Sequence, residues 1–287
     1  MKIALIVNTL KQNAIRCAAQ VSDIFLKNGA GVLIAKSCAP YFNDTRIIFL
    51  PDYRSLVEAC DMALTVGGDG TIIHAAKLAA TAKKPLIGVN VGRLGFAADV
   101  EPNEIYRLPL LLKGNYTTQK RMLLSVTAFD TQDGTREFLA VNDAIIARGQ
   151  LSRIIDLKVS LNDKRISSYR ADGLLFSTPT GSTAYSLSAG GPIIEPEMEC
   201  ILMTPVCPHS LYSRSVVFNP SSRLSVTAAV DDESQAVLTV DGQESVILNP
   251  SSTVVIKRSD LALELLSLNE RNFYTRLNEI LKEREGS

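Results

Sequence analysis

The residues with the clearest chemical potential are 66–71, which read Val-Gly-Gly-Asp-Gly-Thr. The apolar run 62–66 before them predicts a buried strand, and the composition of 71–80 predicts a helix directly after them. Glycines let a backbone turn tightly and approach a ligand, while the N–H groups at a helix N-terminus favour phosphates. A carboxylate among such groups makes sense if it meets a metal ion or a hydroxyl. We therefore predict phosphoryl transfer close to Asp69, with a plain tight turn capped by Asp69 as the alternative.

A second stretch, residues 172–192, carries an apolar run straight into a cluster of Ser, Thr and Gly. A short helix is expected over about 182–189, and the Gly-Gly-Pro sequence at 190–192 ends it. Small hydroxyl residues leave room for a flat ligand and supply both donors and acceptors. Tyr185 is suited to stack on a base or to border it. The alternative is a Ser/Thr-rich turn followed by a capped helix.

A third stretch is the pair Asn142 and Asp143, which lies inside a run of β-forming residues. Strand interiors usually avoid both residue types, so their presence there calls for a reason. An adjacent amide and carboxylate suit contacts to a base and to ribose hydroxyls. A β-bulge or a strand end is the alternative explanation.

Strand-like and helix-like segments alternate over the first part of the chain, which predicts a doubly wound α/β domain. Ligands in such domains gather at the carboxyl ends of the strands, where the loops 67–71 and 90–96 are expected. After about residue 100, β-branched runs alternate with turns, and this pattern predicts a β-rich, sandwich-like domain. The expected organisation is an α/β domain over 1–100, a β-rich domain over 101–260, and a segment over 261–287. The last segment holds an amphipathic helix that should pack back on the first domain.

Composition narrows the range of partners. Lys plus Arg and Asp plus Glu both number 30 in the 287 residues, and the zero net charge argues against non-specific binding of nucleic acid. No stretch approaches the roughly 20 apolar residues of a membrane helix, and the first apolar run is too short for a signal peptide. The expected compartment is the cytoplasm. With two histidines and no Cys-x-x-Cys pair, no zinc site is expected.

The three stretches together resemble the NAD kinase family. The loop 90–96, in the pattern Asn-x-Gly-x-Leu-Gly-Phe, and the sequence Val-Asp-Gly-Gln at 240–243 fit the same family. The Gly-Gly-Asp-Gly turn is shared with phosphofructokinases and with diacylglycerol and sphingosine kinases. Its combination with Thr-Pro-Thr-Gly-Ser-Thr-Ala-Tyr at 178–185 is much more specific. A related lipid or sugar kinase would leave that segment unexplained, and a non-catalytic dinucleotide sensor would not need Asp69.

The resemblance implies transfer of the terminal phosphoryl group of ATP, or of inorganic polyphosphate, to the 2′-hydroxyl of the adenosine ribose of NAD, giving NADP. It also implies a divalent cation, usually Mg²⁺, and a homodimer or homotetramer. Asp69 falls on the family's catalytic aspartate. The positions that fall on its binding residues are Gly68, Gly70, His74, Phe96, Asn142, Asp143, Arg153, Arg170, Asp172, Thr183, Ala184, Tyr185, Ser188 and Gln243.

Some of these positions carry a more specific expectation. His74 should border the phosphates, although a surface position on the helix is its alternative. Phe96 should lie near the dinucleotide, and Asp172 near its nicotinamide end. The family usually has Glu where this chain has Asp143, so the charge is kept while the reach is one methylene shorter. Contact with the ribose would then need a water molecule or a small shift of the backbone.

Overall fold

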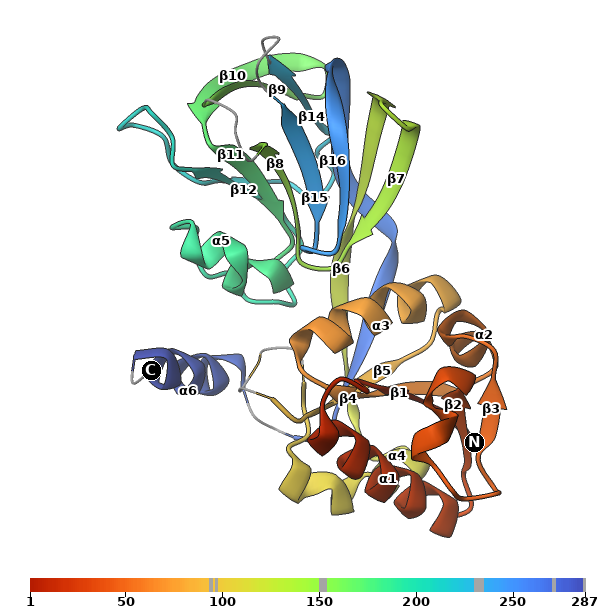
Figure 1. Ribbon diagram of the computed structural model, residues 1–287. Coiled ribbons are helices and arrows are strands. Elements are labelled where there is room, and N and C mark those ends of the chain that lie inside the picture. The colour runs from red at the N-terminus through yellow and green to blue at the C-terminus, as the bar shows by residue number, and fades with distance from the viewer. Residues whose placement is uncertain (93–94, 96–97, 150–153, 230–234, 270–271, 286–287) are drawn as a thin grey trace. The chain divides into compact units, whose positions relative to one another are not determined.

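The computed structural model describes residues 1–92, 95, 98–149, 154–229, 235–269 and 272–285, without the side chains of 283–285. Figure 1 shows the course of the chain, which forms two compact units. The first unit is Met1–Lys120 with Ala262–Ser287, and the second is Arg121–Leu261. Among the described helices, none has the length and the apolar composition to cross a membrane.

The first unit is a doubly wound α/β fold. Its elements are β1 (Lys2–Val7), α1 (Gln12–Lys27), β2 (Gly31–Ala35), η1 (Lys36–Tyr41), β3 (Ile48–Leu50), α2 (Tyr53–Glu58), β4 (Met62–Gly67), α3 (Asp69–Ala82), β5 (Leu86–Asn90), η2 (Pro102–Arg107), α4 (Pro109–Leu112) and α6 (Phe273–Glu285). The strands pair in parallel in the order β5-β4-β1-β2-β3. Helices α2 and α3 cover one face of this sheet, and α1 and α4 cover the other (Figure 1).

Hydrophobic patterning explains these elements. Strands β1 and β4 are apolar almost throughout and buried on both faces, as parallel strands under two helical layers must be. Helix α1 buries Ala14, Ala18, Val21 and Phe25, which recur at helical spacing and form one stripe. Gly29, at a φ of +80°, follows the helix in the left-handed conformation that ends many helices.

The order of the strands fixes where a ligand should bind. From β1 the chain moves to β2 and β3 on one side, and then returns to β4 on the other side of β1. The carboxyl ends of β1 and β4 therefore form the topological switch point of the sheet, where ligands of open α/β folds bind. The turn at 67–71 follows β4 and lies at this point.

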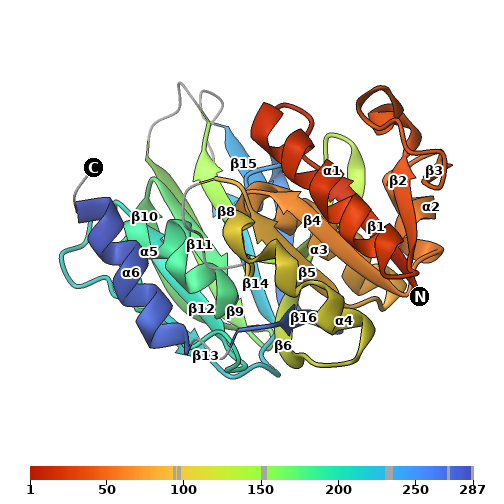
Figure 2. The ribbon, with the colours of Figure 1, turned by 90° about the horizontal axis from the view of Figure 1, so that it is seen from below.

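The second unit is built from antiparallel strands. Its elements are β7 (Gly134–Ala140), β8 (Asp143–Arg148), β9 (Ile155–Leu161), β10 (Lys164–Ala171), β11 (Gly173–Ser177), η3 (Thr180–Thr183), α5 (Tyr185–Ser188), β12 (Ile201–Val206), β13 (Val216–Phe218), β14 (Leu224–Ala229) and β15 (Ala236–Val240), together with most of β6 (Thr117–Thr131) and β16 (Glu244–Ser267). One run of paired strands is β13-β12-β11-β8-β15-β16, and another is β10-β9-β14-β16. Figure 2 shows the strands from below. Their inward residues form one apolar core.

Most expected elements are present, and the architecture agrees with the expectation of an α/β fold followed by a β-rich fold. Strand β7 pairs with β6 and ends before a break at Val141 and Asn142. Strand β8 starts after the break and pairs with β11 and β15 instead. Residues 244–267 form the single long strand β16. The helix expected over 182–189 is divided at Ala184 into η3 and α5.

Candidate active site

Asp69 is the first residue of α3, immediately after the end of β4. Gly68, with extended backbone, occupies the N-cap position, and no side chain caps the helix. The N-cap is therefore Gly68 and not Asp69, which is half-buried and is the first residue of the helix. Among the described residues, a Cβ at Gly68 or Gly70 would meet no atom within 4 Å, so these residues leave the space over this turn open. An anion can thus approach the backbone at the positive end of the helix dipole.

Neighbouring strands hold this turn in place. Gly67 cannot carry a side chain, because a Cβ there would overlap the side chain of Thr71. The carbonyl of Gly67 accepts a hydrogen bond from the backbone N–H of Val91 at 2.9 Å. On the other side, the Asn8 side chain at the end of β1 donates to Thr71 Oγ1 at 3.4 Å. The carboxyl ends of β1, β4 and β5 are thereby fastened together around the turn.

The loop after β5 brings a second backbone segment to Asp69. Asn90, which is 3% exposed, accepts a hydrogen bond from the Gly92 N–H at its Oδ1 (3.0 Å) and so begins the loop. A Cβ on Gly95 would overlap the carboxylate of Asp69, so glycine is required at that position. The carbonyl of Gly95 accepts a hydrogen bond of 2.7 Å from Nε of Arg276, on α6. Arg276 belongs to no sequence motif, so the sequence does not point to it.

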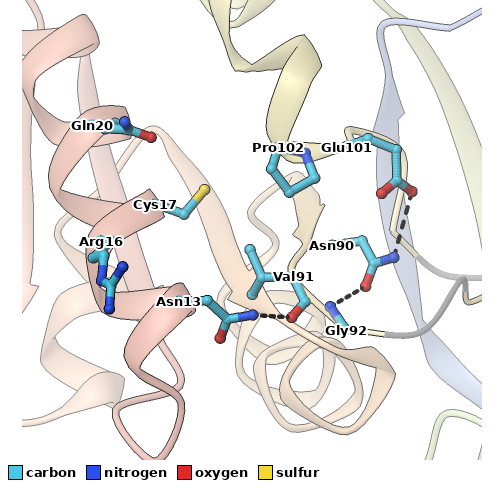
Figure 3. Close-up of a pocket in the computed structure, with 9 residues that line it drawn as sticks. All are labelled: Asn13, Arg16, Cys17, Gln20, Asn90, Val91, Gly92, Glu101 and Pro102. Carbon is cyan, nitrogen blue, oxygen red and sulfur yellow. Dashed lines mark hydrogen bonds between the residues drawn. The ribbon is translucent and has the colours of Figure 1, made fainter.

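A pocket of about 380 Å³ lies beside this loop, between α1 and the start of η2 (Figure 3). Asn13, on α1, lines the pocket, and its side-chain amide donates to the Val91 carbonyl at 2.9 Å. Asn90 donates to Glu101 Oε1 at 3.4 Å on the opposite wall. The remaining lining residues are Arg16, Cys17, Gln20, Gly92 and Pro102. Asn90 and Gly92 therefore contribute both to the pocket and to the loop that reaches Asp69.

His74 lies on the exposed side of α3, and its ring meets the ring of Tyr53, on α2, edge to face at 6.1 Å between centroids. This placement agrees with the alternative of a surface helix position. A contact of His74 with phosphates stays a prediction.

In the second unit, Asn142 and Asp143 stand where β7 has ended and β8 begins. The strand-interior placement was therefore wrong, and the strand-end alternative is correct. The carboxylate of Asp241 holds this corner, since it accepts backbone N–H groups from Val141 (3.0 Å), Asn142 (2.7 Å) and Asp143 (3.0 Å). Asp241 itself has a φ of +50°, a left-handed conformation that Asp tolerates better than most residues. Asp241 belongs to the Val-Asp-Gly-Gln motif at 240–243, and the motif alone does not predict this role of its Asp.

Asp143 is 6% exposed. Burial raises the pKa of its carboxyl group from 3.8 to about 7, and the nearby charge of Asp241 contributes in the same direction. A buried carboxyl group with such a pKa exchanges its proton near neutral pH. Groups of this kind gather at functional sites, which makes Asp143 a candidate for contact with a ligand hydroxyl.

The Ser/Thr-rich segment closes over Asn142. The backbone N–H of Thr178 donates to the Asn142 carbonyl at 2.9 Å, and Thr178 Oγ1 donates to the Val141 carbonyl at 2.7 Å. A Cβ on Gly181 would overlap the backbone of Asn142, so only glycine permits this approach. Among the described residues, the buried hydroxyls of Ser177 and Thr180 have no hydrogen-bond partner. Unsatisfied buried hydroxyls are uncommon and fit a site that a ligand completes.

The other predicted binding residues of this unit differ in exposure. Thr183 is 3% exposed, Ala184 is half-buried, and Tyr185 and Ser188 are exposed on α5. Gln243 is exposed in the turn that also holds Asp241. Of the predicted residues, the structure brings Asn142 and Asp143 together at one corner, and Thr178 and Gly181, just before Thr183, contact that corner.

Asp172 and Arg170 lie at the other end of β11 and on β10. The carboxylate of Asp172 accepts a hydrogen bond from Nε of Arg148 at 2.7 Å, a partner that the sequence analysis did not identify. Arg170 is exposed, and its carbonyl accepts the backbone N–H of His209. Phe96 and Arg153 lie outside the described residues.

The turn at Asp69 combines an open glycine backbone, a helix N-terminus and a carboxylate, and this combination is typical of a phosphotransferase. Comparison with known proteins agrees. Residues 3–116 match the ATP-NAD kinase N-terminal domain, and residues 141–268 match the ATP-NAD kinase C-terminal domain. The chain belongs to the ATP-NAD kinase family.

Relatives support the assignment over nearly the full length. The NAD kinase of Acetivibrio thermocellus is 36% identical over 275 residues, covering 96% of this chain and 94% of the relative. The NAD kinase of Caldanaerobacter subterraneus is 35% identical over 290 residues, covering 99% of each. A solved structure of yeast NADH kinase with NADH has a TM-score of 0.87 at 21% identity, covering 98% of this chain and 87% of that one. An Archaeoglobus fulgidus NAD kinase with ATP reaches 0.74 at 24% identity, covering 98% of each chain. At these identities the two structures support the fold.

Proposed function

We propose that this protein transfers the terminal phosphoryl group of ATP to the 2′-hydroxyl of the adenosine ribose of NAD, giving NADP and ADP. The observation that carries the proposal is the carboxylate of Asp69 beside an open glycine turn at the switch point of the sheet. Membership of the ATP-NAD kinase family supplies the identity of donor and acceptor. A lipid or sugar kinase would leave the match over both domains unexplained, and a non-catalytic dinucleotide sensor would not need Asp69 or the intact glycine turn.

Each of the two units binds one of the two substrates in this proposal. The backbone of Gly68 and Gly70 binds the donor phosphates, because the turn is open and α3 presents its positive end there. Asn142 and Asp143 bind the acceptor nucleoside, and the segment from Thr183 to Ser188 borders the adenine. The phosphate function belongs to residues 1–100, the dinucleotide function to 101–260, and residues 261–287 complete the first domain. His74, Phe96, Arg153, Arg170, Asp172 and Gln243 are further binding positions by resemblance.

The reaction needs positioning more than covalent chemistry. The 2′-oxygen of NAD forms a bond to the terminal phosphorus of ATP, and the bond from that phosphorus to the bridging oxygen breaks as ADP leaves. Asp69 orients the 2′-hydroxyl and accepts its proton late, because an ordinary Asp is a weak base near neutral pH. Asp143 accepts a hydrogen bond from a ribose hydroxyl once its own proton is lost.

Magnesium fits this site as a substrate-borne ion. Among the described residues, no group of three or more His, Cys, Asp or Glu side chains could hold a metal ion alone. Mg²⁺ commonly takes one or two carboxylates together with substrate phosphates and water, and Asp69 offers such a carboxylate. Bound there, the ion would neutralise charge on the phosphate oxygens. Inorganic polyphosphate is the alternative donor, and ATP is favoured by the family match.

By resemblance to the family, the protein works in the cytoplasm as a homodimer or homotetramer. Size-exclusion chromatography with light scattering tests the oligomeric state. The activity is tested by incubating the purified protein with ATP, Mg²⁺ and NAD and measuring the product with an NADP-specific dehydrogenase. Formation of NADP, absent when ATP or NAD is omitted, supports the proposal. Failure with ATP and with polyphosphate would contradict it.

A further inference from the structure

Arg276 is a buried cation placed at the Asp69 turn by the C-terminal helix. It is 8% exposed, and its Nε donates a 2.7 Å hydrogen bond to the carbonyl of Gly95. Its Nη2 is also buried and has no hydrogen-bond partner among the described residues. A buried N–H group without a partner destabilises the folded chain, so packing alone gives no reason to bury this guanidinium.

Gly95 connects Arg276 to the proposed chemistry. Its Cα lies so close to the Asp69 carboxylate that a Cβ would overlap both carboxylate oxygens. The loop after β5 is thus held between two groups: Arg276 on the carbonyl side and Asp69 on the Cα side. A shift of Gly95 would change the space and the rotamer available to Asp69.

The chain shortly before α6 is fastened to the first unit by several hydrogen bonds. Before the helix, the Asp99 carboxylate accepts hydrogen bonds from Ser267 Oγ (2.6 Å) and from the Leu268 N–H (2.7 Å). Arg107 donates to the Leu268 carbonyl and to the side chain of Asn269.

The helix itself is capped and packed. Asn272 Oδ1 accepts the backbone N–H groups of Tyr274 (2.7 Å) and Thr275 (3.2 Å), which is the usual geometry of an Asn N-cap. One turn further on, Leu277 and Ile280 are buried. The helix therefore has a fixed start and an apolar face, and Arg276 extends from that start toward Gly95.

We propose that Arg276 is a positioning residue for phosphoryl transfer. Through Nε it fixes Gly95, and through Gly95 it sets the position of the Asp69 carboxylate against the acceptor hydroxyl. The proposal rests on the proposed function, because Asp69 must be the group that meets the hydroxyl. A misplacement of about 1 Å can cost on the order of 100-fold in rate, so one displaced loop residue is enough to matter.

The test compares Arg276→Met with Arg276→Lys. Both side chains have similar length, but only Lys can donate to the Gly95 carbonyl. Lys282, exposed on the same helix, supplies the control Lys282→Met. We measure kcat and KM for NADP formation, together with the unfolding temperature of each variant.

The expected result is a kcat reduced about 10- to 100-fold in Arg276→Met, with KM values for ATP and NAD changed less than about threefold. Arg276→Lys should recover a large part of the loss, and Lys282→Met should match the parent protein. Full activity of Arg276→Met would overturn the inference, as would a loss that Lys does not recover and that follows the unfolding temperature. If the parent protein and Lys282→Met form no NADP at all, the proposed function fails instead.

Discussion

Asp241→Asn removes one charge from the corner that holds Asn142 and Asp143, and leaves the shape almost unchanged. Asn tolerates the left-handed backbone at this position, where φ is +50°, so strain does not confuse the result. In the parent protein, Oδ1 accepts two backbone N–H groups and Oδ2 accepts the third, from Val141. The side-chain amide of Asn has a single oxygen, which can accept either the two N–H groups bound by Oδ1 or the one bound by Oδ2. Its NH₂ group then faces an N–H group that needs an acceptor.

The magnitude follows from these contacts. A hydrogen bond to a charged group contributes about 1.5–3 kcal/mol, and one between neutral groups about 0.5–1.5 kcal/mol. The substitution removes at least one bond of the first kind and converts the rest to the second. The substitution also removes the repulsion between the carboxylates of Asp241 and Asp143, and this opposes the loss of stability. Burial contributes more than the charge of Asp241 to the raised pKa of Asp143, so the relief of repulsion is the smaller effect. We expect a net loss of about 2–4 kcal/mol.

The assay is urea unfolding followed by circular dichroism, since the chain has no Trp for fluorescence. Asp163→Asn is the matched control: its φ is also positive, at +67°, and its carboxylate pairs with Arg223 on the surface at 82% exposure. An exposed pair of this kind contributes about 0–1 kcal/mol. In parallel, Asp241→Asn should raise the KM for NAD and leave the KM for ATP unchanged. Equal unfolding midpoints for Asp241→Asn and the parent, with an unchanged KM for NAD, would refute the role of Asp241.

Three further substitutions test other contacts. Asp143→Asn should have a higher free energy of unfolding than the parent at pH 8.5, by up to about 4 kcal/mol, because a folded pKa raised from 3.8 to about 7 costs the parent stability as pH rises through that range. Below pH 4 the urea midpoints of the two proteins should converge. A difference in midpoint that does not depend on pH would contradict this prediction. Gly95→Ala should lower kcat at least about tenfold with little change in unfolding temperature, because its Cβ must displace the Asp69 carboxylate; unchanged kcat would show that the loop yields freely. Gly181→Ala should lower the free energy of unfolding by about 1–3 kcal/mol, because its Cβ meets a backbone carbonyl that cannot turn away; an unchanged unfolding midpoint would contradict the close approach.

Local patterns in the sequence predicted the parts of the site that are formed by neighbours along the chain. The apolar run before residue 67, the glycines and the helical composition after 71 led correctly to strand, turn and helix, because each rests on local propensity and periodicity. The same reasoning misplaced Asn142 and Asp143 inside a strand. The side chain that interrupts the strand there, Asp241, comes from about 100 positions further along the chain.

Long-range contacts account for the residues that were missed. Arg276 reaches Gly95 across 181 positions, and no spacing rule connects a helix residue to a loop so distant. Arg148, the partner of Asp172, is separated from it by 24 positions in a neighbouring strand. Such partners depend on strand pairing and on where a terminal helix packs, and both emerge only from the folded chain.

The central claim is that Asp69 stands between a donor phosphate and a ribose hydroxyl. The most direct measurement is the rate of NADP formation by Asp69→Asn beside its affinity for NAD, determined by calorimetry. We expect NAD binding to be kept within about threefold, while kcat falls by at least about 100-fold, the lower range for loss of general acid–base catalysis. Near-normal turnover in Asp69→Asn would contradict the account.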